Sequence, residues 1–273
     1  MKEKNILYKF LPTEYMINVL ENLEFKCTSP EEYSDIHDSA FILDEDLDYT
    51  LNVPGQMQYI IERDFDEIPL SEDWKAEFNK WKEESESLFK NHKLHSIKLM
   101  ERFPNKESIK NFKKGFFETL DRKKLTFCMT KSATNRLMWD IYASGHKGIA
   151  VGINIEHGIF NTPINFPMEM DYLDKIETLP LSVAIWRKWL LKNKEYEFEK
   201  EVRSVFFERQ LIKRKIQNTD MHFLKLPLDA LECIILGANI SKENELRIIN
   251  LYEGQVEILK CKASKSNYDL IVE

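Results

Sequence analysis

The sequence predicts an α+β protein with a mainly antiparallel sheet core and a helical insertion at about residues 70–122. Short apolar runs of strand length recur on both sides of this insertion. Within it, apolar and aromatic residues recur at helical spacing. An apolar fraction of 43% and a charged fraction of 31% over 273 residues are typical of a globular protein. We therefore predict a single α+β domain over residues 1–273.

The N-terminal segment predicts a strand, a helix and a second strand. The run NILYKF is apolar and short enough for a strand. In LPTEYMINVLENLEF, Ile17, Leu20 and Leu23 lie along one helical face, and Thr13 is the predicted N-cap. EFKCTSP then predicts a strand that ends at a proline. The acidic stretch 31–50 predicts a long loop, and such loops are often functional.

The rest of the chain alternates helical and strand-like patterns. The helical insertion carries two sets of apolar residues at helical spacing: Trp74, Phe78, Trp81 and Leu88, then Ile109, Phe112, Phe116 and Leu120. Five later runs predict strands: LTFCMT, KGIAVGIN, EKEVRSVFF, CIILGA and QVEILKCK. We expect helices at about 180–192 and 241–253, the second closed by Gly254 as its C′ residue.

Charge and cysteine usage narrow the function classes. A net charge of −7 argues against a general, salt-driven nucleic-acid binder. The basic runs KNFKKGFFETLDRKK and RQLIKRKIQ are expected to be solvated faces, although either would suit nucleic acid or a phosphate group. No apolar run reaches the roughly 20 residues of a membrane helix, so we predict a cytoplasmic protein. Four scattered cysteines are expected to be buried free thiols and to bind no zinc: Cys27, Cys128, Cys233 and Cys261.

The stretch EFEKEVRSVFF carries the main candidate site. As a strand it places Glu199, Glu201 and Arg203 on one face, and Phe198 with Val202 on the other. Carboxylates roughly 6.6 Å apart repel by about 2.5 kcal/mol at an effective dielectric of about 20. The Arg203 charge would offset much of this repulsion and keep Glu201 ionised. Such a pair suits a site where one carboxylate stays charged while the other carries a proton; the alternative is an exposed face with salt bridges.

A second candidate lies in NRLMWDIYASGHKGIAVGIN. Helical spacing places Trp139, Tyr142 and His146 on one face, and two glycines predict that the helix ends near the histidine. The functional interpretation is an aromatic wall with His146 beside a cleft. The structural interpretation is a core aromatic pair with a capping histidine.

A third candidate lies in the acidic loop. Asp35, His37 and Asp38 are possible metal ligands, but their spacing also fits turn formation, and we expect no metal.

Together these stretches resemble the bacterial domain-of-unknown-function family 2971. LYKF and EFKCTSP match its opening strands, and Tyr33, Asp35 and Asp38 keep part of the motif that follows. FCMTK and LMWDIYASGHKGIAVGI match its central motifs, the second closely. EKEVRSV matches its last strand, with Val202 where the family has Trp.

This order of motifs also looks like that of the ADP-ribosyltransferase superfamily, whose fold binds NAD between two small sheets. The resemblance implies a first-strand position at Tyr8 and Lys9, a second position at Thr28 or Ser29, and a last glutamate at Glu201. Lys9 stands where the superfamily usually has His or Arg.

The same resemblance implies a role for each remaining candidate. Glu201 would bind the nicotinamide ribose, and Glu199 would orient or deprotonate the acceptor. Tyr142 or Trp139 would stack on nicotinamide, while Arg203 or Lys9 would hold the pyrophosphate.

The expected partners are NAD and a protein or nucleic-acid acceptor, and we expect no membrane association. The resemblance implies a role as a bacterial toxin or phage-defence effector. Two alternatives stay open. One is a metal-dependent nuclease or hydrolase using Asp35, Asp38 and Glu199 or Glu201. The other is a non-enzymatic binding or sensor module.

Overall fold

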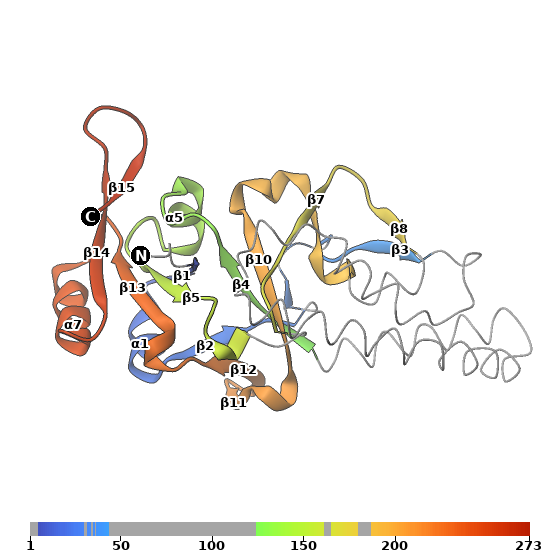
Figure 1. Ribbon diagram of the computed structural model, residues 1–273, viewed down its shortest axis with the longest axis horizontal. Coiled ribbons are helices and arrows are strands. Elements are labelled where there is room, and N and C mark those ends of the chain that lie inside the picture. The colour runs from blue at the N-terminus through green and yellow to red at the C-terminus, as the bar shows by residue number, and fades with distance from the viewer. Residues whose placement is uncertain are drawn as a thin grey trace, which may run out of the picture. The chain divides into compact units, whose positions relative to one another are not determined.

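The computed structural model describes residues 5–29, 32, 33, 35, 37–43, 124–160, 165–179 and 187–273 (Figure 1). The chain divides into two compact units. Unit 1 comprises Met1–Thr28, Leu125–Met170 and Glu195–Glu273, and unit 2 comprises Ser29–Lys124 and Asp171–Lys194. The predicted helical insertion at 70–122 lies outside the described residues, so it and the single-domain assignment stay predictions.

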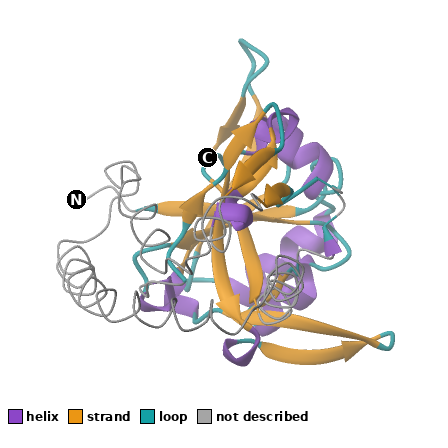
Figure 2. Ribbon diagram, turned by 90° about the vertical axis from the view of Figure 1, so that its right-hand side faces the viewer, coloured by secondary structure: helices purple, strands orange, loops and turns teal. Residues whose placement is uncertain are grey.

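An eight-stranded sheet forms the centre of unit 1, in the order β15–β14–β13–β5–β1–β4–β10–β6. Its strands are β1 (Ile6–Leu11), β4 (Lys124–Thr130), β5 (Ile149–Asn154), β6 (Met168–Glu169), β10 (Glu201–Phe207), β13 (Leu231–Leu236), β14 (Glu257–Ala263) and β15 (Leu270–Val272). Strand β1 is antiparallel to both β4 and β5, while β13 and β14 are parallel and are joined through helix α7 (Lys242–Tyr252). The predicted α+β class and mainly antiparallel sheet are confirmed, and strands predominate among the described residues (Figure 2).

Apolar residues cover both faces of this sheet, because successive side chains of a strand point to opposite sides. Leu7 and Leu11 of β1 belong to the larger cluster, which includes residues of α1 (Met16–Asn22) and α7. Phe10 belongs to the second cluster, with Met138 and Trp139 of α5 (Arg136–Tyr142). Figure 1 shows α1 and α5 on opposite sides of β1 and β5.

A second, three-stranded sheet of unit 1 has the order β11–β12–β2. Its strands are β2 (Glu24–Cys27), β11 (Ile212–Ile216) and β12 (Thr219–Lys225). Gln217 and Asn218 join β11 to β12 with φ of 48° and 66°, the left-handed conformation that two-residue hairpin turns require. The basic run RQLIKRKIQ thus lies largely on an exposed hairpin strand, as a solvated face.

Short strands and turns form the described part of unit 2. Its elements are β3 (Phe41–Leu43), β7 (Asp171–Leu173), β8 (Glu177–Leu179), the 3₁₀ turn η4 (Lys188–Leu190) and β9 (Leu191–Asn193). Strand β3 pairs with β8 and β7 pairs with β9, both in parallel. Two expectations are therefore wrong where this unit is described: the acidic 31–50 stretch contains a strand, and the helix predicted to reach residue 192 is a 3₁₀ turn followed by a strand.

The remaining short elements of unit 1 are 3₁₀ turns: η3 (Gly158–Phe160), η5 (Lys194–Glu199, which begins at the last residue of unit 2), η6 (Glu208–Gln210) and η7 (Leu228–Ala230). The helix predicted at 241–253 is confirmed as α7, capped by Ser241 and followed by Gly254 with φ of 72°. Thr13 is not the N-cap of α1, because that helix begins after Tyr15 without a side-chain cap. Among the helices that the structure describes, none has the length and apolar character needed to cross a membrane.

Candidate functional site

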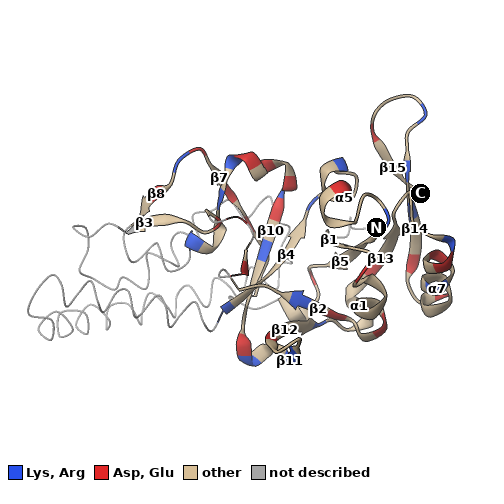
Figure 3. Cartoon of the chain, turned by 180° about the vertical axis from the view of Figure 1, so that it is seen from behind, with Lys and Arg blue, Asp and Glu red and all other residues tan. Residues whose placement is uncertain are grey.

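Glu201 and Arg203 form a bidentate ion pair on β10. Arg203 Nε donates to Glu201 Oε1 at 2.7 Å and Nη2 donates to Oε2 at 3.2 Å. The Glu201 side chain is 7% exposed and that of Arg203 is 1% exposed. The two residues point the same way because they lie two apart on a strand, as the sequence predicts. Figure 3 shows acidic and basic residues together on β10. The pair is buried, so the alternative of an exposed salt-bridged face is wrong.

Glu199 does not lie on this strand. It ends the 3₁₀ turn η5, and Lys200 has a left-handed φ of 45° before β10 begins at Glu201. The prediction of Glu199, Glu201 and Arg203 along one strand face is therefore wrong. The prediction that Phe198 and Val202 share the opposite face is also wrong. Phe198 packs against the second cluster, which contains Met138 and Trp139 of α5, whereas Val202 belongs to the larger cluster. The left-handed backbone at Lys200 thus lies between the two glutamates and puts them in different elements.

Three side chains from the end of β4, the N-cap of α5 and the last turn of α5 hold Glu199 and its neighbour. The Thr130 hydroxyl donates to the Glu199 carbonyl at 2.6 Å, and Asn135 Nδ2 donates to the Phe198 carbonyl. The Tyr142 hydroxyl donates to Glu199 Oε1 at 2.5 Å. Glu199 itself is only 3% exposed. These contacts fix both the backbone and the carboxylate of Glu199.

Cys128 of β4 is a second neighbour of Glu201, beside Arg203. Burial raises the pKa of the Cys128 thiol to about 11, and the carboxylate of Glu201 next to it contributes. The neighbours of these two residues along the strands, Phe127 and Val202, belong to the larger cluster, so alternation places Cys128 and Glu201 together on the other face. Thr130 shares that face because it follows Cys128 by two residues, and Tyr8 shares it because it pairs with Thr130 in register. Glu201, Cys128, Thr130 and Tyr8 thus line one side of β10, β4 and β1.

Thr28 joins this same face through β4. An isolated antiparallel bridge pairs Thr28 with Thr126, and paired residues share a face. The Thr126 hydroxyl donates to the Thr28 carbonyl at 3.1 Å and lies 3.6 Å from Cys128 Sγ. Ser29 follows Thr28 and accepts a main-chain bond from Glu32. Of the two residues predicted for the second position, Thr28 is the one placed on the Glu201 face.

Lys9 points to the other side of the sheet. Its neighbour Tyr8 faces Thr130, and alternation along the strand turns Lys9 away. Lys9 Nζ donates to the Cys128 carbonyl at 2.8 Å and lies 5.2 Å from the centre of the Phe127 ring. Phe127 belongs to the larger core cluster. Lys9, predicted at the first-strand position and as a pyrophosphate ligand, therefore lies on the opposite face of the sheet from Glu201.

Trp139 and His146 form a stacked pair that belongs to the core. Trp139 is fully buried, and its indole N–H donates to the Ala133 carbonyl at 2.8 Å. The His146 ring stacks on it with centroids 5.8 Å apart, and His146 Nε2 lies 3.2 Å from Asp140. Because Trp139 is fully buried between Phe10 and His146, its ring is covered by the core and does not form the open wall that stacking on nicotinamide would need. The helix ends before His146, as the sequence predicts, and Tyr142 is hydrogen-bonded to Glu199.

The acidic-loop candidates lie in unit 2. Asp35 Oδ1 accepts the His37 main-chain N–H at 2.9 Å, which is a turn-forming contact. Asp38 Oδ1 accepts the Ser39 hydroxyl at 3.0 Å, and its Oδ2 lies 3.8 Å from Lys192 Nζ. Within the described ranges, no three His, Cys, Asp or Glu side chains gather as a possible metal site.

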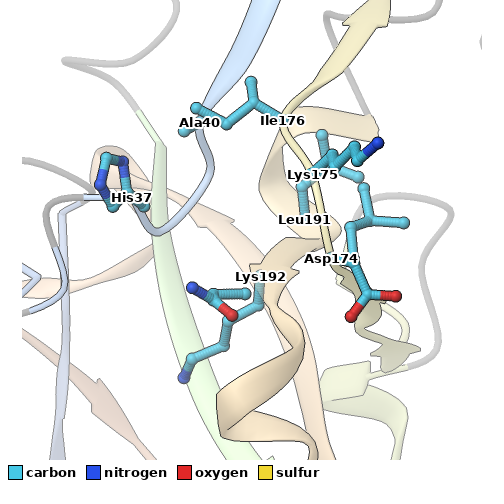
Figure 4. A pocket seen from close by; sticks show the side chains of 9 residues that line it. His37, Ala40, Asp174, Lys175, Ile176, Leu191 and Lys192 are labelled. Atoms are coloured by element: carbon cyan, nitrogen blue, oxygen red, sulfur yellow. The ribbon is translucent and has the colours of Figure 1, made fainter.

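A cavity of about 210 Å³ opens in unit 2 (Figure 4). It combines aliphatic walls with polar side chains: His37, Ala40, Leu173, Asp174, Lys175, Ile176, Leu191, Lys192 and Asn193. Its charges are already balanced in part, because Lys192 faces Asp38 and Asp174 faces Lys194 at 3.4 Å. None of the predicted NAD-binding residues lines it.

Comparisons of the chain with protein-family models, curated proteins and solved structures found no match. The resemblance to family 2971 therefore rests on the quoted motifs.

Three residues of the site were not predicted from the sequence: Cys128, Thr130 and Asn135. A cap signal was available for Asn135, which directly precedes an amphipathic helical run and accepts the main-chain N–H groups of Leu137 and Met138. No sequence pattern indicates that its amide also reaches residue 198.

Proposed function

We propose that this chain is an ADP-ribosyltransferase-like enzyme, which cleaves the bond between nicotinamide and ribose in NAD and transfers ADP-ribose to an acceptor. The proposal includes membership of family 2971 and a role as a bacterial toxin or phage-defence effector. The observation that carries it is the buried Glu201–Arg203 pair, which shares a sheet face with Thr28. This is the combination of a last-strand glutamate and a second-strand hydroxyl that the superfamily resemblance implies.

Glu201 would stabilise the positive charge that develops on the ribose as nicotinamide leaves. Such charge resembles the oxocarbenium character of glycoside hydrolysis. The guanidinium of Arg203 favours the ionised form of Glu201, and this ionised carboxylate would bind the ribose hydroxyls. A preorganised carboxylate in a buried site is the arrangement expected to stabilise charge effectively.

The proposed roles of the other residues follow from their positions. Glu199 would act on the acceptor, since it is a separate buried carboxylate held by Tyr142. Arg203 would act on Glu201 and not on the pyrophosphate, because Nε and Nη2 are both directed at that carboxylate. Lys9, on the opposite face, has no part in this scheme. Thr28 and Tyr8 stay as ligand-binding candidates.

Nicotinamide release from NAD by the purified protein tests this proposal. We expect release by the wild type, a loss of about 10²-fold or more in Glu201→Gln, and no effect of EDTA. Release abolished by EDTA would instead favour the metal-dependent hydrolase. An inactive wild type that NAD does not stabilise against heat would favour a binding or sensor module.

A further inference from the structure

Tyr142 connects the buried Glu199 carboxylate with the surface of α5. The tyrosine is 38% exposed, whereas Glu199 is 3% exposed. Its hydroxyl lies 2.5 Å from Glu199 Oε1, within the range of hydrogen bonds to an ionised carboxylate. The phenol thus links a solvent-facing helix to this carboxylate.

The backbone around Glu199 is held independently of this bond. Thr130 binds the Glu199 carbonyl, Asn135 binds the Phe198 carbonyl, and the Lys131 N–H donates to the Lys200 carbonyl at 3.3 Å. Removal of the Tyr142 hydroxyl alone therefore leaves the turn in place. What it changes is the charge and direction of the carboxylate.

The Tyr142 bond favours the ionised form of Glu199. A carboxyl group in a buried position is more easily protonated than one in water, because burial disfavours the charged form. A hydroxyl that donates to the carboxylate opposes this effect. The bond also restrains the direction of the carboxylate relative to α5.

We propose that Tyr142 is the positioning residue of Glu199, which keeps this carboxylate ionised and aims it at the acceptor. The role as acceptor base rests on the proposed function. As the acceptor oxygen or nitrogen bonds to ribose C1′, the C1′–nicotinamide bond breaks and its electron pair leaves with nicotinamide. The acceptor proton passes to Glu199, which becomes a carboxylic acid and later returns the proton to solvent.

The test is a pH titration of the Glu199 carboxyl by ¹³C NMR in Tyr142→Phe, with the signal assigned by its loss in Glu199→Gln. We expect the titration midpoint to rise by about one pH unit relative to the wild type. Fluorotyrosine at position 142 is a stronger hydrogen-bond donor and should lower the midpoint. Tyr268→Phe is the matched control, since Tyr268 is 97% exposed on the β14–β15 hairpin, and it should leave the midpoint unchanged.

The second readout is the pH profile of ADP-ribose transfer. Tyr142→Phe should lower the rate at pH 7 about 10- to 100-fold, the range for a hydrogen bond to a charged group, and shift the rising limb to higher pH. An unchanged midpoint in Tyr142→Phe would overturn the assignment of Tyr142, whatever the activity. A raised midpoint in a protein that does not cleave NAD would support Tyr142 as the residue that controls Glu199 and overturn the proposed function.

Discussion

Replacement of Arg203 by leucine removes one partner of a buried ion pair. Glu201 would then lose the guanidinium that pairs with it, while its side chain stays 7% exposed. Because the remaining charge has neither water nor a guanidinium beside it, we expect the free energy of unfolding at pH 7 to fall by about 3–5 kcal/mol.

The size of this effect follows from the geometry of the pair. Two unit charges about 4 Å apart attract by about 4 kcal/mol at an effective dielectric of about 20. The two N–O contacts at 2.7 and 3.2 Å place the charge centres near this separation. Replacement of both residues should cost less than the sum of the single replacements, because no charge is then left alone.

Urea unfolding of wild type, Arg203→Leu, Glu201→Gln and the double variant measures the coupling. Arg247→Leu is the control, since Arg247 pairs with Glu21 at 2.5 Å but its side chain is 56% exposed; its cost should be under about 1 kcal/mol. Additive single effects within about 0.5 kcal/mol would refute the reasoning, because they would mean that the two residues do not interact.

Two further predictions concern stability away from the glutamate pair. Hydrogen bonds from Arg214 lower the pKa of Glu24 below its ordinary value of 4.5. The pair therefore stabilises the fold fully at pH values above 4.5, and this stabilisation is lost as the pH falls through the lowered pKa. Arg214→Met should therefore be less stable than wild type at pH 7 and equal to it near pH 2, by urea unfolding at each pH; a difference that persists in acid would contradict this. A Cβ on Gly148 would lie 2.1 Å from the Leu11 carbonyl oxygen, so Gly148→Ala should lose about 1–3 kcal/mol of unfolding free energy. Gly158→Ala, where a Cβ meets nothing within 4 Å, is the matched control, and equal losses in the two variants would count against steric contact as the cause.

The sequence indicates most of the strands of unit 1 because their apolar runs are fully or half buried. Strand β5 contains the apolar run IAVGI and β13 contains the apolar run CIIL, and both strands lie between other strands of the eight-stranded sheet. The β11–β12 hairpin escapes this reasoning, since its first strand reads IKRKI and is largely exposed. Its signal lies in the turn, where Gln217 and Asn218 adopt positive φ, and asparagine tolerates that conformation well.

The site is only partly predictable for a related reason. Glu201 and Arg203 lie two apart on one strand, so strand geometry alone places them together. Glu199 follows the same spacing but leaves the strand, because Thr130 and Asn135, more than 60 residues earlier, bind the backbone of residues 198 and 199. Local periodicity contains no information about such contacts between distant parts of the chain.

The side of the sheet that Lys9 takes could not be predicted from its motif. Its position within LYKF matches the first-strand position of the superfamily, but a motif does not state which face of the sheet a residue takes. That face is decided by the register Tyr8–Thr130, which depends on how β1 and β4 pair.

Nicotinamide release from NAD, compared between wild type and Glu201→Gln in the presence of EDTA, is the most direct measurement of the proposed activity. Glu201→Gln keeps the shape of the side chain and removes its charge, so its loss of stability, followed by urea unfolding, must be measured beside its loss of rate. We predict release by the wild type and little or none by folded Glu201→Gln. Equal release by both proteins, or none by a folded wild type, would contradict a catalytic role for Glu201.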